Sequence, residues 1–92
     1  MAARAYATLD FTPTFLDDLT NGREYKQAER KAFLRALKLL DENEKHPSLR
    51  LHELGRNLRG TWSVSASDSL RMSFVRTASG RKTMLTCSHH YQ

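Results

Sequence analysis

The stretch TWSVSASDSLRMSFVRTASGRKTMLTCS, residues 61–88, decides the fold because polar and apolar residues alternate along it in three short runs. Such alternation is typical of strands that bury one face and leave the other open. Segments rich in serine, aspartate and glycine at 67–69 and 78–80 separate the runs and are typical of tight turns. The stretch therefore predicts a three-stranded antiparallel meander with strands at 61–66, 70–76 and 82–88.

Upstream of the meander, the pattern predicts one strand and two helices. Residues 5–11 alternate like a half-buried strand, and Thr12-Pro13 then supplies an N-cap followed by proline at the first helical position. Asn21-Gly22 ends this short helix. Residues 24–44 follow as a long amphipathic helix whose apolar positions recur at three and four. These positions are Ala28, Ala32, Phe33, Ala36, Leu37 and Leu40.

Residues 45–60 contain proline, two glycines and several cations, and they predict a loop with one brief turn. The short break at Gly22 lets the two helices fold back as a hairpin with one apolar face toward the sheet. The order β-α-α-β-β-β then gives a two-layer α+β domain in which the helical hairpin packs on an antiparallel sheet. Residues 1–92 are expected to form this single domain, with the other sheet face open for a site.

Composition narrows the class of protein. The chain carries 15 Lys and Arg residues against 10 Asp and Glu residues, a net charge of +5, which favours polyanions or acidic protein segments as partners. A hydrophobic content of 39% argues against disorder. Cys87 is the only cysteine, which excludes an internal disulfide and favours the cytoplasm. No run approaches the roughly 18 apolar residues of a membrane span, so we expect no membrane partner.

Arg71 is the first candidate site residue. If Leu70 and Met72 face the helices, strand alternation turns Arg71 to the open face. A guanidinium there offers a rigid fork to two phosphate oxygens and can offset the charge of a pentacoordinate transition state. The plainer alternative is an ion pair with an acid such as Asp68.

Two histidines and a tyrosine follow the last predicted strand. One of His89 and His90 can share the face of Arg71 while the other points elsewhere, and we choose His90 as a general acid. Solvent-facing terminal histidines are the alternative. Tyr91 can stack on a base or hydrogen-bond a phosphate, or it can simply anchor the tail.

A general base is available in the basic loop. Either His52 or Glu53 can take the proton of a 2′-hydroxyl, which turns that oxygen into the nucleophile and requires neither water nor metal. The alternative is that both are solvated, with Glu53 paired to Arg50 or Arg56.

A metal site is not expected. Zinc needs about three or four ligands, and the four histidines are enough in number. Their spacing matches no recognised ligand pattern, however, and adjacent histidines rarely bind one ion from a strand end. The four are His46, His52, His89 and His90.

Together, these motifs resemble the RelE/ParE superfamily of type II toxin–antitoxin toxins. The run Leu-x-x-Asn-Leu-x-Gly-x-Trp-Ser from Leu54, the strand arginine and the terminal Cys-x-x-His-Tyr from Cys87 carry the likeness, which is strongest to YoeB-like and YafQ-like mRNA interferases. The resemblance implies a RelE-like, microbial-ribonuclease-type fold. It also implies a bacterial, cytoplasmic endoribonuclease that cleaves messenger RNA in the ribosomal A site without a cofactor and so inhibits translation.

The resemblance also implies roles by position. Arg71 matches the family's phosphate-stabilising arginine, His90 its general acid, and Tyr91 the terminal tyrosine beside it. In YoeB-like sequences the base is a glutamate two residues before the motif leucine, whereas this chain has His52 there and Glu53 one step later. YafQ-like toxins have His-x-Leu at that place, which favours His52 over Glu53.

Partners follow from the same likeness. The basic residues Lys45, Arg50, Arg56 and Arg59 would hold RNA through phosphate contacts. The implied partners are the ribosome with its A-site message and a cognate antitoxin protein that covers the cleft or extends the sheet edge. A homodimer is left open.

Two alternatives to the ribonuclease belong to other classes. One is a ParE-like toxin that inhibits DNA gyrase and has no nuclease site, and the other is a nontoxic interaction module. Members of the gyrase-inhibiting branch generally lack the arginine and histidine set, so Arg71 and His90 argue against the first.

Overall fold

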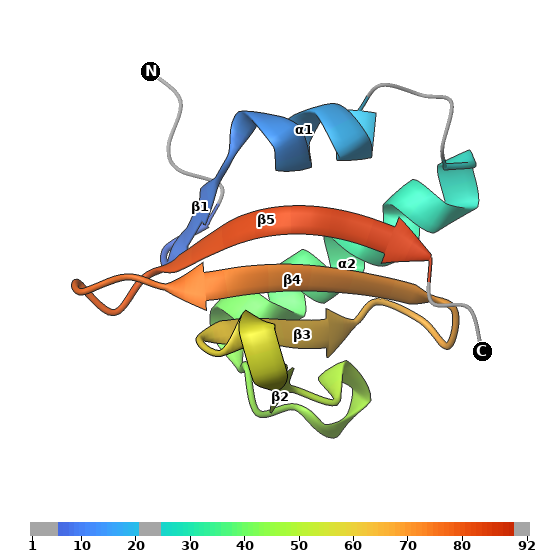
Figure 1. Ribbon diagram of the computed structural model, residues 1–92. Helices are drawn as coiled ribbons and strands as arrows, with labels where there is room; N and C mark the ends of the chain where they lie inside the picture. Colours follow the sequence, from blue (N-terminus) through green and yellow to red (C-terminus); the bar gives the residue numbers. More distant parts are fainter. Residues whose placement is uncertain (1–5, 21–24, 90–92) are drawn as a thin grey trace, which may run out of the picture.

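A five-stranded sheet runs through the middle of the molecule and two helices pack against it (Figure 1). The computed structural model describes residues 6–20 and 25–89. The strands are β1 (Leu9–Phe11), β2 (His52–Glu53), β3 (Thr61–Ser65), β4 (Leu70–Arg76) and β5 (Lys82–His89). Their order is β1-β5-β4-β3-β2, with β1 parallel to β5 and the other pairs antiparallel. The predicted α+β class is confirmed.

Both helices begin at side-chain caps. Helix α1 (Pro13–Thr20) starts after Thr12, whose Oγ1 accepts the amide N–H of Phe15 at 3.1 Å. Helix α2 (Gln27–Glu42) starts where Glu29 Oε1 accepts the amide N–H of Lys26 at 2.8 Å. The helix predicted over 24–44 is therefore shorter at both ends: Tyr25 and Lys26 precede it and it ends at Glu42, while residue 24 lies outside the described residues.

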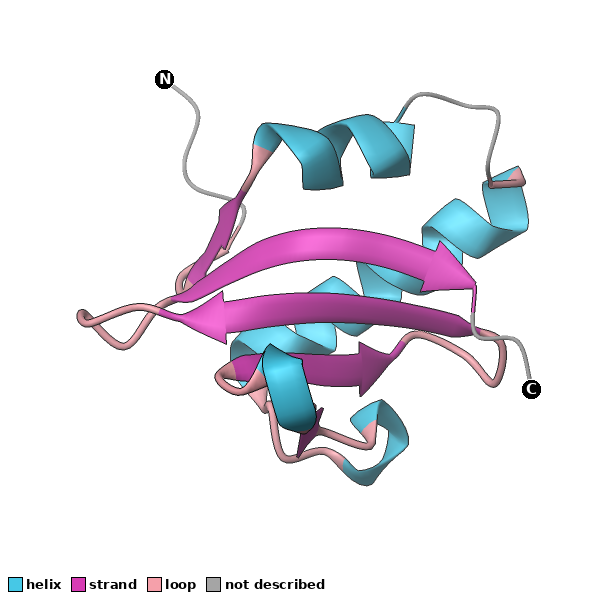
Figure 2. Ribbon diagram, viewed as in Figure 1, coloured by secondary structure: helices cyan, strands magenta, loops and turns pink. Residues whose placement is uncertain are grey.

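One hydrophobic core joins the helices to the sheet. Helix α1 lies against β5 and α2 against β4, and α2 passes behind the sheet in Figure 2. The predicted inward face of β4 is confirmed, since Leu70, Met72 and Phe74 are each at most 2% exposed. Burying one such side chain contributes about 1.5–3 kcal/mol. The largest fully buried side chains are Phe15, Phe33, Phe74, Leu37, Leu40, Leu49, Met72, Met84 and Val64. None of the described helices is long and apolar enough to cross a membrane.

Residues 45–60 are more regular than the predicted loop with one turn. They form two 3₁₀ helices, Pro47–Leu49 and Arg56–Leu58, with β2 between them paired to β3. Leu49 is 1% exposed and anchors the first 3₁₀ helix in the core. A strand of two residues is too short to show alternation, so the sequence pattern did not predict this fifth strand.

Strand β1 is shorter than the alternation over 5–11 predicted. The amide N–H groups of Ala7 and Thr8 donate to the carboxylate of Asp41 at 2.9 and 2.7 Å, so a side chain takes the place of a strand partner there. Residue 5 lies outside the described residues.

A bulge in β5 changes which residues share a face. Ser73 pairs with Thr86 and Phe74 with Met84, so Leu85 between them has no partner on β4. Strict alternation would place Met84 and Cys87 on opposite faces. The extra residue brings both to the core, at 0% and 6% exposure.

Candidate functional site

The sheet face turned away from the core carries hydroxyl side chains and one arginine. Arg71 on β4 lies between Ser65 of β3 and Ser88 of β5 in the strand register. One pair further along, Ser73 of β4 lies between Ser63 and Thr86. Cross-strand partners share a face, so these six side chains belong to one surface, which we call the open face.

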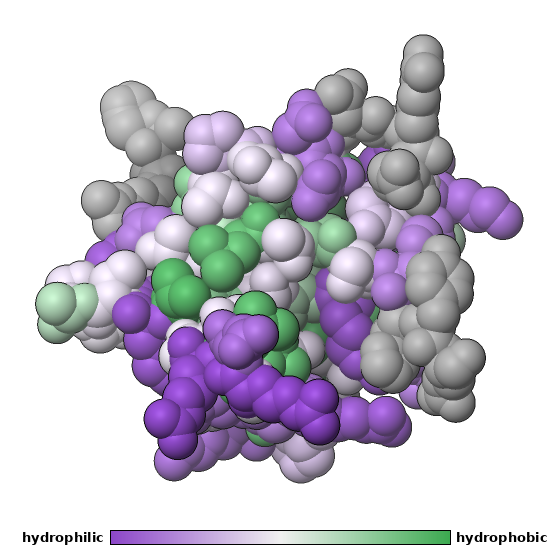
Figure 3. Space-filling model, viewed as in Figure 1, coloured by the Kyte–Doolittle hydropathy of each residue, from purple (hydrophilic) through white to green (hydrophobic). Residues whose placement is uncertain are grey.

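A hollow of about 450 Å³ lies on the open face. Three leucines and a row of polar groups line it, and Figure 3 shows apolar surface in the middle of this face above a hydrophilic area. A hollow with leucines on one side and a guanidinium on the other suits a nucleotide, whose base is flat and apolar and whose phosphate is charged. The lining residues are Leu54, Leu58, Leu85, Thr61, Ser63, Arg71, Met72, Ser73, Thr86 and Ser88.

Arg71 is held by neutral groups. Its Nη1 donates to the carbonyl oxygens of Ser67 at 2.8 Å, Asp68 at 3.2 Å and Leu70 at 3.1 Å. The Asp68 carboxylate lies 4.0 Å from Nη2 of Arg50 instead. Among the described residues Arg71 forms no ion pair, so the pairing with Asp68 that the sequence left open is not formed. The guanidinium is fixed in place and keeps its full positive charge.

His52 shares the open face with Arg71. It pairs across the sheet with Ser63, one of the residues that line the hollow. Its Nδ1 lies 2.9 Å from the carbonyl oxygen of Arg50. A carbonyl can only accept a hydrogen bond, so Nδ1 carries the proton and Nε2 of the neutral ring presents a lone pair. In this tautomer the Nε2 lone pair of His52 can accept a proton.

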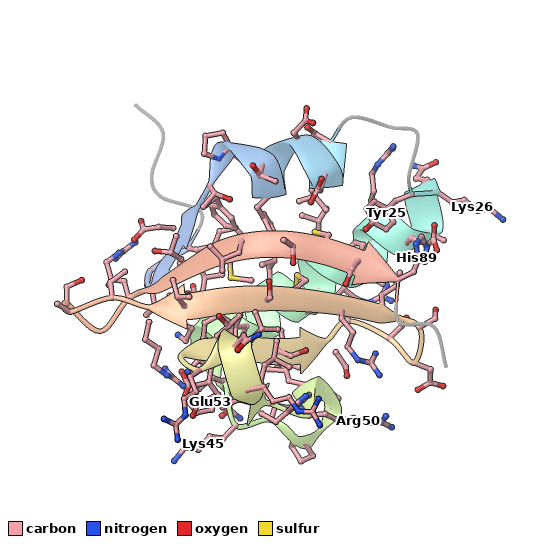
Figure 4. The ribbon with its side chains drawn as sticks, viewed as in Figure 1. Tyr25, Lys26, Lys45, Arg50, Glu53 and His89 are labelled. Atoms are coloured by element: carbon pink, nitrogen blue, oxygen red, sulfur yellow. The ribbon has the colours of Figure 1, made fainter. Side chains whose placement is uncertain are left out.

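Glu53 points to the other face. It pairs with Trp62, and its Oε2 accepts the amide N–H of Gly60 at 2.8 Å. This contact closes the loop between β2 and β3, in the lower part of the view in Figure 4. The structure therefore separates the two candidate bases, which are neighbours in the sequence, and places only His52 on the face of Arg71.

His89 lies on the core face. It pairs with Leu70, whereas Arg71 pairs with Ser88. Its Nε2 lies 3.0 Å from Oε2 of Glu29, and its ring lies 5.1 Å from that of Tyr25 (Figure 4). The amide of Lys26, and then His89, lower the pKa of Glu29. His89 therefore points away from Arg71, and the predicted general acid His90 and its neighbour Tyr91 lie outside the described residues.

The predicted RNA-binding cations are all exposed on the segment beside β2. Among the described residues, only Arg50 of the four forms an ion pair. Arg50 and Arg56 have φ of 49° and 58°, in the left-handed region that residues other than glycine rarely adopt. The four are Lys45, Arg50, Arg56 and Arg59.

The three described histidines considered for zinc, His46, His52 and His89, do not gather. His46 Nδ1 accepts the amide N–H of Ser48 at 3.2 Å, while His52 and His89 make the separate contacts given above. Within residues 6–20 and 25–89, no three His, Cys, Asp or Glu side chains are grouped as metal ligands would be.

Solved structures share the fold of this chain. The YoeB/ParE toxin from Agrobacterium tumefaciens superposes with a TM-score of 0.73 at 16% identity, covering 92% of this chain and 100% of that chain. The RelBE2 toxin–antitoxin complex of Mycobacterium tuberculosis gives 0.71 at 22% identity, over 90% of this chain and 96% of that chain. The YoeB–YefM complex of Staphylococcus aureus gives 0.71 at 20% identity, over 95% and 100%.

This chain has the RelE/ParE toxin fold. No protein-family model matches the sequence, and no curated protein matches it either. The fold that the resemblance implied is confirmed by these likenesses to solved structures.

Within this RelE/ParE fold, the sequence analysis did not identify the three leucines that line the hollow, Leu54, Leu58 and Leu85. Leu54 and Leu58 belong to the Leu-x-x-Asn-Leu motif given above. The side chain of Leu58 is 53% exposed, which is unusual for a leucine that serves only the core. Leu85 carries no such signal because it lies at the bulge, where it has no partner on β4. Cys87 has no place in the site, since burial raises the pKa of its thiol to about 12.

Proposed function

We propose that this chain is the toxin of a type II toxin–antitoxin system and a ribosome-dependent mRNA endoribonuclease. The observation that carries the proposal is Arg71, a guanidinium fixed by neutral carbonyls at the edge of a nucleotide-sized hollow. A phosphate is the partner that such a group lacks. His52, on the same face, supports a nuclease rather than a simple anion site.

In the proposed reaction, Nε2 of His52 takes the proton of a 2′-hydroxyl. The 2′-oxygen attacks the adjacent phosphorus and forms the new P–O bond while Arg71 stabilises the added negative charge. The bond from phosphorus to the 5′-oxygen then breaks, and His90 donates a proton to that oxygen with Tyr91 beside it. The products are a 2′,3′-cyclic phosphate, which can open to a 3′-phosphate, and a 5′-hydroxyl.

The proposed partners are the ribosome with its A-site message, and an antitoxin. Lys45, Arg50, Arg56 and Arg59 would contact RNA phosphates and so position the chain without reading sequence. The RelBE2 and YoeB–YefM structures are toxin–antitoxin complexes, and a YoeB dimer from Staphylococcus aureus is also similar, at a TM-score of 0.67. They support an antitoxin partner and keep a homodimer open. The cytoplasm, where translation occurs, is the compartment this function requires.

Primer extension on a translated message tests the proposal. The wild-type protein should produce discrete 5′-hydroxyl ends only when ribosomes translate the message, and Arg71→Ala or His90→Ala should remove them and convert growth arrest into tolerance. Arg35→Ala, which removes an exposed cation on α2, is the matched control and should cut like wild type. A double Arg71→Ala, His90→Ala protein that is still fully toxic would refute the nuclease. Inhibition of gyrase supercoiling without any cut message would support the ParE-like alternative instead.

A further inference from the structure

The end of β5 is attached to the start of α2. Nε2 of His89, the last residue of the strand, lies 3.0 Å from Oε2 of Glu29. The His89 ring lies 5.1 Å from the ring of Tyr25, which is 6% exposed and packs edge-on against Phe33. Figure 4 shows His89 beside Tyr25 and the beginning of the helix. One polar contact and one aromatic contact therefore hold the strand end from the core side.

Glu29 is itself fixed, because both of its carboxylate oxygens have partners. Oε1 accepts the amide N–H of Lys26 at 2.8 Å, and Oε2 faces His89. A carboxylate only accepts hydrogen bonds, so Nε2 of His89 carries the hydrogen of this contact. The side chains of His89 and Glu29 are 24% and 26% exposed, and a pair this exposed adds little to global stability. The contact orders the strand end more than it supports the core.

This ordering matters because the pairing of β5 with β4 stops at the same place. His89 pairs with Leu70, the first residue of β4, so the described ladder ends there. Chain ends fray where pairing stops unless other contacts hold them. Leu70 also belongs to the mount of Arg71, since its carbonyl oxygen accepts from Nη1 of Arg71 at 3.1 Å. The contact with Glu29 thus fixes the last described strand residue, one ladder pair away from the guanidinium.

We propose that Glu29 is a positioning residue for the general acid: it holds His89 so that the next residue, His90, is presented to the open face. Consecutive strand residues point to opposite faces, and His89 points to the core face. His90 itself lies outside the described residues. The inference rests on the proposed ribonuclease function, in which His90 protonates the leaving 5′-oxygen. Without the contact the strand end is freed, and misplacing a reacting group by about 1 Å costs up to about 10²-fold in rate.

Single-turnover cleavage of a short synthetic message bound in the ribosome tests this role. Glu29→Ala should lower the rate about 10- to 10²-fold. In a protein that already carries His90→Ala, the same change should lower the rate less than about twofold further, because an absent acid cannot be misplaced. Glu29→Gln should recover most of the rate. Its amide oxygen can still accept the Lys26 N–H, and its NH₂ group can donate to Nε2 of His89 once the ring proton moves to Nδ1.

A message with sulfur in place of the 5′-oxygen at the cleaved linkage separates a misplaced acid from a general defect. The 2′-oxygen forms the same bond to phosphorus, and the P–S bond breaks to release a thiolate that leaves without being protonated. On this message Glu29→Ala and His90→Ala should both cleave within about threefold of wild type. Arg71→Ala should stay slow on it, because the charge added at phosphorus still needs the guanidinium.

Lys26→Pro is the matched control. It removes the amide N–H that Glu29 accepts and leaves the contact between Glu29 and His89, and the φ of −73° at Lys26 suits proline. Its rate per folded molecule should stay within about threefold of wild type on the ordinary message. A loss as large as that of Glu29→Ala would mean that the start of α2 matters and the contact with His89 does not, which would overturn the inference.

Backbone amide relaxation measures the positioning without any chemistry. The heteronuclear NOE of the His90 amide should fall in Glu29→Ala and keep its wild-type value in Lys26→Pro. An unchanged NOE in Glu29→Ala, or a Glu29→Ala protein that remains slow on the sulfur message, would overturn the inference.

Failure of this inference and failure of the ribonuclease are distinguishable. Cleavage at the wild-type rate by Glu29→Ala, with His90→Ala slow, would overturn the positioning role alone. A wild-type protein that cleaves no translated message would overturn the ribonuclease, and with it the acid that Glu29 is proposed to position.

Discussion

Arg71 and Arg76 lie on the same strand but on opposite faces of the sheet, and their surroundings differ in kind. Arg76 donates to both carboxylate oxygens of Glu44 at 3.1 and 2.7 Å, and its guanidinium lies 4.8 Å from the ring centre of Trp62. Arg71 is held only by backbone carbonyls. Carbonyls orient a guanidinium without neutralising it, whereas a carboxylate does both. Arg76 therefore ties the segment after α2 to the sheet, whereas Arg71 keeps a charge that an anion can pair with.

The same contrast extends to the two edges of the sheet. At the β1 edge, Arg81 Nε lies 2.7 Å from Oδ2 of Asp10. Lys82 is only 5% exposed; its Nζ donates to the Thr8 hydroxyl and lies 3.4 Å from Oε1 of Glu44. At the β2 edge, within the described chain, Lys45, Arg56 and Arg59 form no ion pair and that of Arg50 is long. The unpaired cations beside β2 therefore lie next to the open face, where the proposed RNA strand would approach.

Replacing Arg71 by alanine should have the largest effect. We expect cleavage of a translated message to fall about 10³-fold, because the group that offsets transition-state charge is lost. The melting temperature should change little, since only bonds to neutral carbonyls disappear. Arg71→Lys should recover only part of the rate because an ammonium lacks the fork. A large fall in melting temperature for Arg71→Ala would show that Arg71, like Arg76, contributes mainly to stability.

The two neighbouring candidate bases offer the next comparison. His52→Ala should lower the cleavage rate about 10²-fold, as expected for loss of a general base. Glu53→Gln keeps an acceptor for the Gly60 amide and should leave the rate nearly unchanged. Single-turnover cleavage of the same message checks both. A reversed order would assign the base to Glu53.

Strand alternation accounts for what could be predicted about this site. The placement of Arg71 opposite Leu70 and Met72 required only the alternation of side chains in β4. The bulge at Leu85 and the two-residue strand β2 leave no periodic trace, so the faces of Thr86, Cys87 and Ser88 and the separation of His52 from Glu53 could not be derived. Both depend on which strands meet, which is a tertiary property.

Arg76→Ala should act on stability rather than on chemistry. Losing the ion pair with Glu44 and the contact with Trp62 should lower the free energy of unfolding by roughly 1–2 kcal/mol, the typical sum for a partly exposed pair and a cation–π contact. Cleavage per folded molecule should remain at the wild-type level. Denaturant unfolding and a rate normalised to folded protein measure the two effects. A rate that falls as far as in Arg71→Ala would show that the faces of the sheet are not independent.

The dependence of stability on pH should be the smallest effect. Arg76 lowers the pKa of Glu44. Burial alone would raise the pKa of Asp41, but hydrogen bonds from the Thr8 hydroxyl and the amides of Ala7 and Thr8 hold it below its usual value. A carboxyl whose pKa is lower in the folded state stabilises the fold above its unfolded pKa, about 4. That stability is lost as the pH falls through the lowered value.

Melting temperature measured from pH 7 to 3 should therefore stay level and then decline below about pH 4. Asp41→Asn should start lower at pH 7 and decline less, since it no longer has this proton to gain. Arg71→Ala is the informative control, because a group held by carbonyls has no carboxylate whose pKa it lowers. Its curve should parallel that of the wild type. A flattened curve for Arg71→Ala would reveal an acidic partner of Arg71, and the two faces of β4 would then differ in degree only.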